Sequence, residues 1–242
     1  MKVILLYLHI ARRAEEFSAY GRRFIETYMK FPPGIEHELH VVNCNGLGLQ
    51  REAVEIYHPA ARAYHQYDGE GFDIGAHQAV GKTLDCDFLV CTSSQTYFWK
   101  SGWLKRFVEA RENHGDGFYG IMASHECAPH LRTCFYGLNP RNFAAYPHTI
   151  NSKEDSWRFE HQDWCISEWF MDRGNPALLV TWDGCYEKKD WMTVPNGFRK
   201  GDQSNCLAFD RHSLIYQESS GEEKTTLEWL VYGKPDQKQN VD

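Results

Sequence analysis

The 242-residue sequence lacks a surplus of basic residues, because 33 acidic side chains outnumber 26 lysines and arginines and leave a formal net charge of −7. Nucleic-acid-binding proteins normally carry a positively charged face, so we expect no nucleic-acid partner. The sequence also lacks the apolar run of about 18 residues that a transmembrane helix needs. The apolar start at residues 3–10 is too short to span a bilayer, and no small-residue cleavage site follows it. We therefore expect no transmembrane segment and a cytoplasmic location.

The eight cysteines lack the two-residue spacing that is typical of zinc knuckles and redox motifs. Several of them lie inside apolar runs that have the character of buried strands or helices. Buried, unpaired thiols are common in proteins of reducing compartments, so the pattern favours reduced cysteines over a disulfide framework. No Asn-X-Ser/Thr glycosylation acceptor occurs either, which agrees with a cytoplasmic protein.

Two familiar catalytic patterns are absent as well. Ser93 and Ser94 are not framed by the Gly-X-Ser-X-Gly elbow of the α/β-hydrolases. His125, Glu126 and His130 are close in sequence, but their spacing matches no familiar zinc motif. The sequence therefore predicts neither a serine hydrolase nor a zinc protein.

Aromatic residues, in contrast, are abundant, since they form 14% of the chain and include eight tryptophans. Tryptophan and tyrosine rings can pack against sugars and bases in a binding groove, and they can equally fill a hydrophobic core. Both interpretations stay open for each ring.

Apolar runs alternate with amphipathic segments through the first half of the chain. Strands are predicted at residues 3–10, 38–43, 63–67 and 87–91, and helices at residues 14–30, 51–57, 74–84 and 102–113. Strands that alternate with helices at this spacing form right-handed βαβ units and a mostly parallel sheet. The sequence therefore predicts the α/β class.

The second half departs from this alternation. Strands are predicted at residues 120–123, 133–136 and 177–181, and helices at residues 139–146 and 155–172. Gly174 is a typical C-terminal stop for the last of these helices. An irregular region is expected at residues 183–203, and residues 233–242 are polar enough to form a frayed tail.

Residues 69–104 carry the clearest functional pattern. Asp73 occupies the expected N-cap of the helix at residues 74–84, and the free amides of that helix start can bind an anion such as a diphosphate. The alternative is an ordinary capped helix whose glycines allow tight turns. Thr92, Ser93 and Ser94 follow the strand at residues 87–91, where ligands bind in open α/β sheets.

Asp163 stands out in the second half. The predicted helix places this carboxylate near a helix N-terminus, where the dipole keeps an acid ionised and able to accept a proton. The alternative is an exposed acid with no catalytic role.

The order of these motifs resembles that of the GT-A glycosyltransferases, and more narrowly the rhamnan-synthesis group of polysaccharide enzymes. Residues 71–75, Gly-Phe-Asp-Ile-Gly, are similar to a Gly-X-Asp-Ile-Gly segment of that group. Residues 91–94 resemble its hydroxyl-rich variant of the acidic loop, and residues 130–135 resemble its His-Leu-X-Ser/Thr-X-Phe segment. Residues 162–164, Gln-Asp-Trp, resemble the Glu-Asp-Trp helix of inverting transferases.

The resemblance implies a GT-A-like sandwich around a mostly parallel central sheet. It implies a hexosyl- or deoxyhexosyltransferase that moves a sugar from a nucleotide-diphosphate donor to a glycan hydroxyl, with inversion, in polysaccharide or glycan biosynthesis. One catalytic domain is expected at residues 1–232, with a nucleotide-binding half at 1–115, an acceptor-side half at 116–232 and a polar tail at 233–242. The alternative is an inactive domain that binds sugar nucleotides or glycans.

The resemblance also assigns roles to individual residues. Asp163 is the expected catalytic base, with Glu160 as its nearest rival. The expected donor-binding residues are His9, Arg12, Asp73, Gly75, Thr92, Ser93, Ser94 and Lys200, and the expected acceptor-side residues are His130, Arg132 and Trp164. No residue is assigned to a metal, and a divalent Mn or Mg ion is an optional cofactor because the loop after the strand lacks carboxylates.

Overall fold

A computed structural model describes residues 1–10, 14–44 and 51–233 of the chain. Arg12, residues 45–50 and all but the first residue of the tail expected at residues 233–242 lie outside the described residues. Within the described ranges, no helix combines the length and the apolar character that crossing a bilayer requires. No disulfide bond joins any of the eight cysteines in the described part of the chain.

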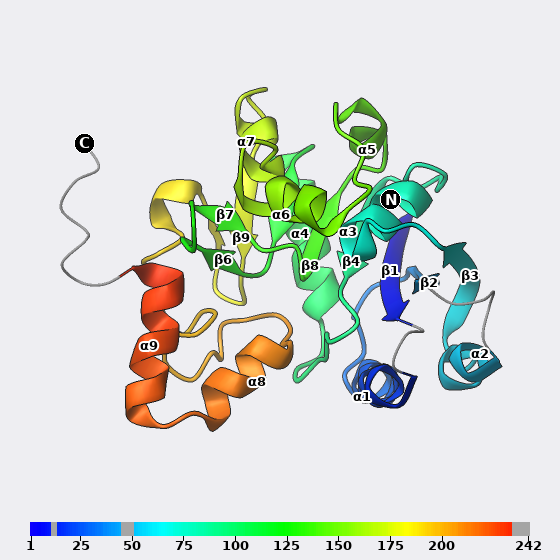
Figure 1. Cartoon of the computed structure of the whole chain (residues 1–242), viewed down its shortest axis with the longest axis horizontal. Coiled ribbons are helices and arrows are strands. Elements are labelled where there is room, and N and C mark those ends of the chain that lie inside the picture. The colour runs from blue at the N-terminus through cyan, green and yellow to red at the C-terminus, as the bar shows by residue number, and fades with distance from the viewer. Residues whose placement is uncertain (11–13, 45–50, 234–242) are drawn as a thin grey trace.

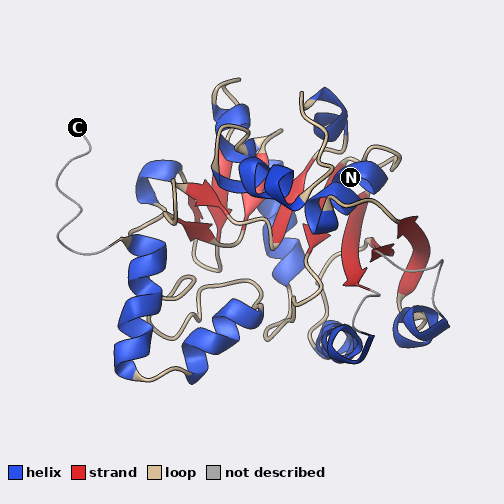
Figure 2. Cartoon of the chain, viewed as in Figure 1, coloured by secondary structure: helices blue, strands red, loops and turns tan. Residues whose placement is uncertain are grey.

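A central sheet organises the molecule (Figures 1 and 2). Its eight strands are β1 (Val3–Ile10), β2 (Glu38–Cys44), β3 (Ala61–Tyr67), β4 (Phe88–Thr92), β5 (Phe118–Gly120), β8 (Phe135–Leu138), β9 (Ala177–Val180) and β10 (Cys185–Tyr186), in the order β10-β9-β5-β8-β4-β1-β2-β3. Strands β3, β2, β1 and β4 run parallel, as do β5 and β9. Strand β8 is antiparallel to both of its neighbours, and β10 is antiparallel to β9. The predicted α/β class with a mostly parallel sheet is confirmed.

Helices cover both faces of the sheet. They are α1 (Ala14–Lys30), α2 (Arg51–Tyr57), α3 (Phe72–Gly81), α4 (Trp103–His114), α5 (Arg141–Ala145), α6 (Lys153–His161), α7 (Ile166–Met171), α8 (Arg211–Glu218) and α9 (Gly221–Tyr232), with a 3₁₀ helix at Lys188–Asp190. A short hairpin of β6 (Ala123–Ser124) and β7 (His130–Leu131) stands outside the main sheet.

Alternating side chains of β1 belong to two different cores, because successive residues of a strand point to opposite faces. Leu5 and Tyr7 pack with residues of α1, α2 and α4, among them Phe24. Leu6 and Leu8 pack on the other face with residues of α3, α6 and α7. The sheet is therefore buried on both sides, as expected for parallel strands.

The single helix predicted at residues 155–172 is wrong. Helix α6 starts earlier, where the Ser152 hydroxyl accepts a hydrogen bond from Asp155 N at 3.0 Å, and it ends at His161. Gln162 then adopts an extended backbone (φ −123°, ψ −150°), and α7 begins only at Ile166. The turn between them lets the Trp164 ring stack on His148 at 4.1 Å between centroids.

Helices α8 and α9 have no counterpart among the predicted elements. Both are amphipathic only weakly, so a hydrophobic stripe does not reveal them. Each starts with a capping box, formed by Asp210 with Ser213 and by Ser220 with Glu223. That reciprocal pattern of polar residues is the sequence signal that marks the two helix starts.

His77 of α3 is buried completely, with Nδ1 at 3.2 Å from the Tyr136 hydroxyl. Burial lowers its pKa to about 4, although the nearby Asp73 carboxylate acts in the opposite direction. The native state therefore holds a neutral imidazole at pH values where an unfolded chain, with an ordinary histidine pKa of about 6.5, already binds a proton.

This difference predicts a pH-dependent stability. The contribution of His77 is complete above about pH 6.5 and falls by up to about 3 kcal/mol as the pH drops to about 4, at 1.4 kcal/mol per unit. The variant His77→Gln should lose part of its stability at pH 7.5 but show a flatter decline between pH 6.5 and 4 in urea denaturation. The exposed His114→Gln is the matched control. An unchanged slope in His77→Gln would contradict the assignment.

Candidate functional site

A pocket of about 490 Å³ opens at the carboxyl ends of β1 and β4. Ligands bind at this edge in open α/β sheets, because the loops that follow parallel strands converge there. Its lining residues come from β1, α1, β2, the start of α3, the loop after β4 and the start of α6, and they are Leu8, Ile10, Phe17, Cys44, Phe72, Asp73, Ser93, Ser94, Gln95 and Lys153. The lining therefore combines apolar side chains with a carboxylate, two hydroxyls and an ammonium group.

The start of α3 has an unusual backbone. Phe72 has a φ of +50°, which few residues other than glycine adopt, and its ring is 42% exposed at the pocket. The N-cap is Gly71, which supplies no side chain, so the prediction of Asp73 as the N-cap is wrong. Asp73 lies in the first helical turn, where its Oδ1 accepts from Ile74 N at 3.1 Å.

The loop after β4 is fixed from two directions. Ser93 N donates to the Cys134 carbonyl at 2.8 Å, and the Ser94 carbonyl accepts from the Tyr7 hydroxyl at 2.7 Å. Both serines line the pocket. The Thr92 side chain is instead buried away from the pocket, and its hydroxyl has no hydrogen-bond partner among the described residues.

Among the described residues, the predicted donor residues His9 and Lys200 do not line this pocket. His9 projects from the opposite face of β1 to Leu8, with Nδ1 at 2.9 Å from the Tyr57 hydroxyl. Lys200 donates to the Met192 carbonyl at 3.1 Å. Arg12 lies outside the described residues.

Gly75 serves close packing. A side chain at this position would meet the Tyr67 hydroxyl at 2.5 Å and the Ile150 carbonyl at 2.8 Å. Gly71 is confined by the same two residues. The glycines that suggested a phosphate-binding turn therefore let α3 pack closely on Tyr67 and Ile150.

Lys153 is the charged lining residue that the sequence analysis did not predict. It is the first residue of α6, and its ammonium lies 5.7 Å from the centroid of the Phe72 ring. Nothing in the local sequence marks it, because the residue reaches the pocket only through the packing of α6 on α3. That packing includes a hydrogen bond of 2.9 Å from the Ser156 hydroxyl to the Gly71 carbonyl.

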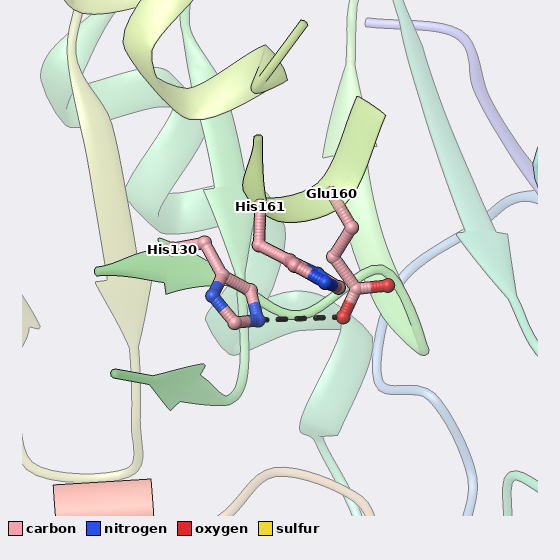
Figure 3. Close-up of side chains that lie close together, drawn as sticks. All are labelled: His130, Glu160 and His161. Carbon is pink, nitrogen blue, oxygen red and sulfur yellow. Dashed lines mark ion pairs between the residues drawn. The ribbon is translucent and has the colours of Figure 1, made fainter. Parts of the chain in front are cut away.

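The predicted acceptor-side residue His130 lies beside Glu160 at the far end of α6 (Figure 3). The predicted acceptor-side residue Arg132 is close enough for its charge to act on the same carboxylate. His130 Nε2 is 3.5 Å from Glu160 Oε1, and the Thr133 hydroxyl donates to Glu160 Oε2 at 2.6 Å. Burial alone would raise the pKa of Glu160, but His130, Arg132 and Thr133 outweigh it and lower the pKa to about 2. This carboxylate is therefore ionised at neutral pH.

Asp163 lines a second pocket of about 280 Å³, together with Trp164 and His148. It lies in the turn between α6 and α7, two residues before the α7 N-cap Cys165 and thus near a helix N-terminus but outside the first helical turn. Its carboxylate is 60% exposed and forms a two-pronged ion pair with Arg158, whose Nε is 2.8 Å from Oδ1. The Arg158 guanidinium holds the pKa of Asp163 below its usual range.

Carboxylates are scarce around the first pocket. Asp73 is the one carboxylate among its described lining residues. The sequence does contain an Asp-X-Asp triplet, Asp85-Cys86-Asp87, but this triplet precedes β4 and lies at the opposite edge of the sheet. There Asp87 Oδ2 accepts from Lys2 N at 2.7 Å. The triplet therefore cannot serve a ligand in the pocket.

No protein-family model matches the chain, and no curated protein matches it. Solved structures of similar shape include S. aureus TarS 1–349, with a TM-score of 0.45, 15% identity and coverage of 64% of this chain and 53% of TarS 1–349. Mouse xyloside xylosyltransferase 1 has a TM-score of 0.46 and 9% identity, covering 72% of this chain and 76% of that one.

A putative glucose-1-phosphate thymidylyltransferase from Bacillus anthracis, in complex with a sucrose, has a TM-score of 0.49 and 10% identity, covering 72% of this chain and 84% of that one. The chain thus matches only about half the length of TarS 1–349. At these TM-scores the likeness does not define a function, which has to be argued from the site itself.

The packing role of Gly75 predicts a stability effect. The variant Gly75→Ala should lower the free energy of unfolding by about 1–3 kcal/mol, because the added methyl group overpacks the contact with Tyr67 and Ile150. Gly221→Ala is the matched control, since nothing lies within 4 Å of a side chain built there. Chemical denaturation of both variants measures the difference. A Gly75→Ala protein as stable as the Gly221→Ala control would contradict the packing role.

Proposed function

We propose that the protein is a glycosyltransferase that moves a sugar from a nucleotide-diphosphate donor to a glycan hydroxyl. The observation that carries this proposal is the pocket at the carboxyl ends of β1 and β4, which combines aromatic, acidic, hydroxyl and cationic groups. These are the groups that bind the nucleotide base, the sugar hydroxyls and the diphosphate of such a donor. The motif order of the sequence supports the same donor class.

Each part of the donor has a matching group in the pocket. The Phe17 and Phe72 rings suit the nucleotide base, because aromatic side chains stack on the faces of bases. The Asp73 carboxylate suits hydroxyl groups of the ribose, which donate hydrogen bonds to acids in other nucleotide sites. Lys153 suits the diphosphate, whose negative charge grows as it departs. The volume of about 490 Å³ falls within the range of small-molecule sites.

Transfer with inversion is a direct displacement. A base removes the proton of the acceptor hydroxyl while the oxygen attacks the anomeric carbon, and the bond to the diphosphate breaks. Lys153 and the amides at the start of α3 then offset the charge of the leaving group. Asp73 is the residue that would hold an optional Mn or Mg ion in this pocket.

We assign the base to Asp163, with Glu160 as the rival. Asp163 is ionised and borders an open pocket in which Trp164 and His148 offer stacked rings to a sugar. Lys153 and His161, the two ends of α6, lie about 12 Å apart along the helix at 1.5 Å per residue, and Asp163 follows in the turn beyond His161. Glu160 lies nearer to Lys153 along that helix but is held among His130, Arg132 and Thr133.

The finer proposals of polysaccharide biosynthesis, a hexosyl or deoxyhexosyl group, and a cytoplasmic location rest on the family resemblance.

Measurement of donor binding tests whether the nucleotide sugar occupies this pocket. A thermal-shift screen over nucleotide-diphosphate sugars should raise the melting temperature for the preferred donor, and binding should survive EDTA because hydroxyls replace most carboxylates around the pocket. Asp73→Asn and Lys153→Gln should each weaken donor binding at least about tenfold, the worth of one lost charged hydrogen bond. Lys105→Gln, outside the pocket, is the matched control. Binding that both pocket variants retain would contradict this placement.

Measurement of turnover tests whether Asp163 is the catalytic base. Asp163→Asn keeps the size of the side chain but removes its proton-accepting charge, so transfer should fall by roughly 10²- to 10⁴-fold while donor affinity persists. Steady-state kinetics with the authentic acceptor measures both quantities. Near-normal transfer by Asp163→Asn together with a large loss in Glu160→Gln would move the role to Glu160.

The Arg158 ion pair, which weakens Asp163 as a base, favours a second candidate function, an inactive domain that binds sugar nucleotides. Donor hydrolysis in the absence of acceptor separates the two functions. Slow release of the nucleoside diphosphate is expected from a transferase, whereas a binding domain would leave the donor intact.

A further inference from the structure

We propose that His130, Glu160 and His161 form a zinc-binding site separate from the donor pocket. His130 begins β7, and Glu160 and His161 end α6, so residues distant in sequence converge on one point (Figure 3). One ligand atom from each of the three residues lies within 4.8 Å of the others. The local spacing of His125, Glu126 and His130 could not predict this set, because two of its three members come from another element.

The distance between the first two ligands fits a shared ion. His130 Nε2 and Glu160 Oε1 are 3.5 Å apart, which exceeds the usual N–H···O distance of 2.7–3.2 Å. Two ligands bound to tetrahedral zinc at about 2.0–2.1 Å lie about 3.3 Å from each other. The pair is therefore spaced as two ligands of one zinc ion would be.

Hydrogen bonds behind the ligands orient them for an ion. His130 Nδ1 lies 2.7 Å from the Ala128 carbonyl, which can only accept, so Nδ1 carries a proton. In the neutral ring, Nε2 then presents its lone pair to Glu160 Oε1, so either a second ring proton or a metal cation between the two atoms makes the contact favourable. The Thr133 hydroxyl fixes the other oxygen of Glu160. Such outer hydrogen bonds to a histidine and a carboxylate are characteristic of metal sites.

His161 supplies an independent observation. Both of its ring nitrogens are inaccessible to solvent and have no hydrogen-bond partner among the described residues. The ring is held in place, 4.9 Å from the His130 ring and edge-on to Trp157 at 4.8 Å. Buried polar atoms are normally satisfied, so an orphaned imidazole beside a histidine and a carboxylate points to a missing ligand.

The chemistry of the three ligands favours zinc. Two imidazoles and one carboxylate suit zinc, whereas magnesium and calcium prefer sites made of oxygen atoms. Three protein ligands leave a fourth position for water or an anionic oxygen. The ion would join β7 to the end of α6, and its binding should therefore stabilise the fold.

Metal titration tests the site in the full chain. After removal of metals with a chelator and reduction of the thiols, calorimetry with zinc chloride should show one ion per chain, and zinc should raise the melting temperature. Cobalt should give the visible spectrum of a tetrahedral nitrogen–oxygen site, without a thiolate charge-transfer band. His161→Gln, which loses no hydrogen bond, and Glu160→Gln should each weaken zinc binding by more than the 10- to 100-fold typical of outer-shell changes.

His148→Gln is the matched control, because this histidine stacks on Trp164 outside the triad. It should keep the wild-type zinc affinity. Absence of stoichiometric zinc binding, an unchanged affinity in His161→Gln, or a thiolate band from cobalt would each overturn the proposal and leave the triad as an ion pair of His130 and Glu160 with the His161 ring beside it. Because these experiments measure metal binding, a failure of the zinc proposal would leave the proposal of a donor pocket unaffected.

Discussion

The buried hydrogen bond from the Tyr7 hydroxyl to the Ser94 carbonyl connects the core of this protein to its candidate site. Tyr7 belongs to β1, whose side chains pack into the cores on both faces of the sheet. The bond is 2.7 Å long and excluded from water, so a misplaced loop would leave two polar groups unsatisfied. The position of Ser93 and Ser94 is therefore set by the same packing that holds the sheet together.

The first half of the fold could be predicted because its signals are local. The apolar run of β1 and the amphipathic α1 have the bounds that their patterns predict. The break at Gln162 and the helices α8 and α9 escaped prediction, since one depends on how Trp164 packs and the others lack an apolar stripe. Hydrophobic periodicity predicts which face of an element is buried, but it does not predict elements whose bounds depend on tertiary contacts.

The site was predictable to a similar degree and for similar reasons. Asp73, Ser93 and Ser94 reach the pocket because they follow or begin elements at the carboxyl edge of the sheet. Lys153 and the grouping of His130 with Glu160 and His161 depend on how α6 packs on α3 and β7, which no local pattern encodes. Gly75 shows the converse error, because a glycine that resembles a phosphate turn in sequence serves packing in the structure.

The central claim is that the donor occupies the pocket at the carboxyl ends of β1 and β4. Hydrogen–deuterium exchange with and without a saturating nucleotide-diphosphate sugar tests it most directly, because exchange reports local opening segment by segment. The account predicts slower exchange at the start of α3, around Phe72 and Asp73, and in the loop of Ser93 and Ser94. Protection confined to the turn of Asp163 and Trp164, with no change at the first pocket, would contradict it.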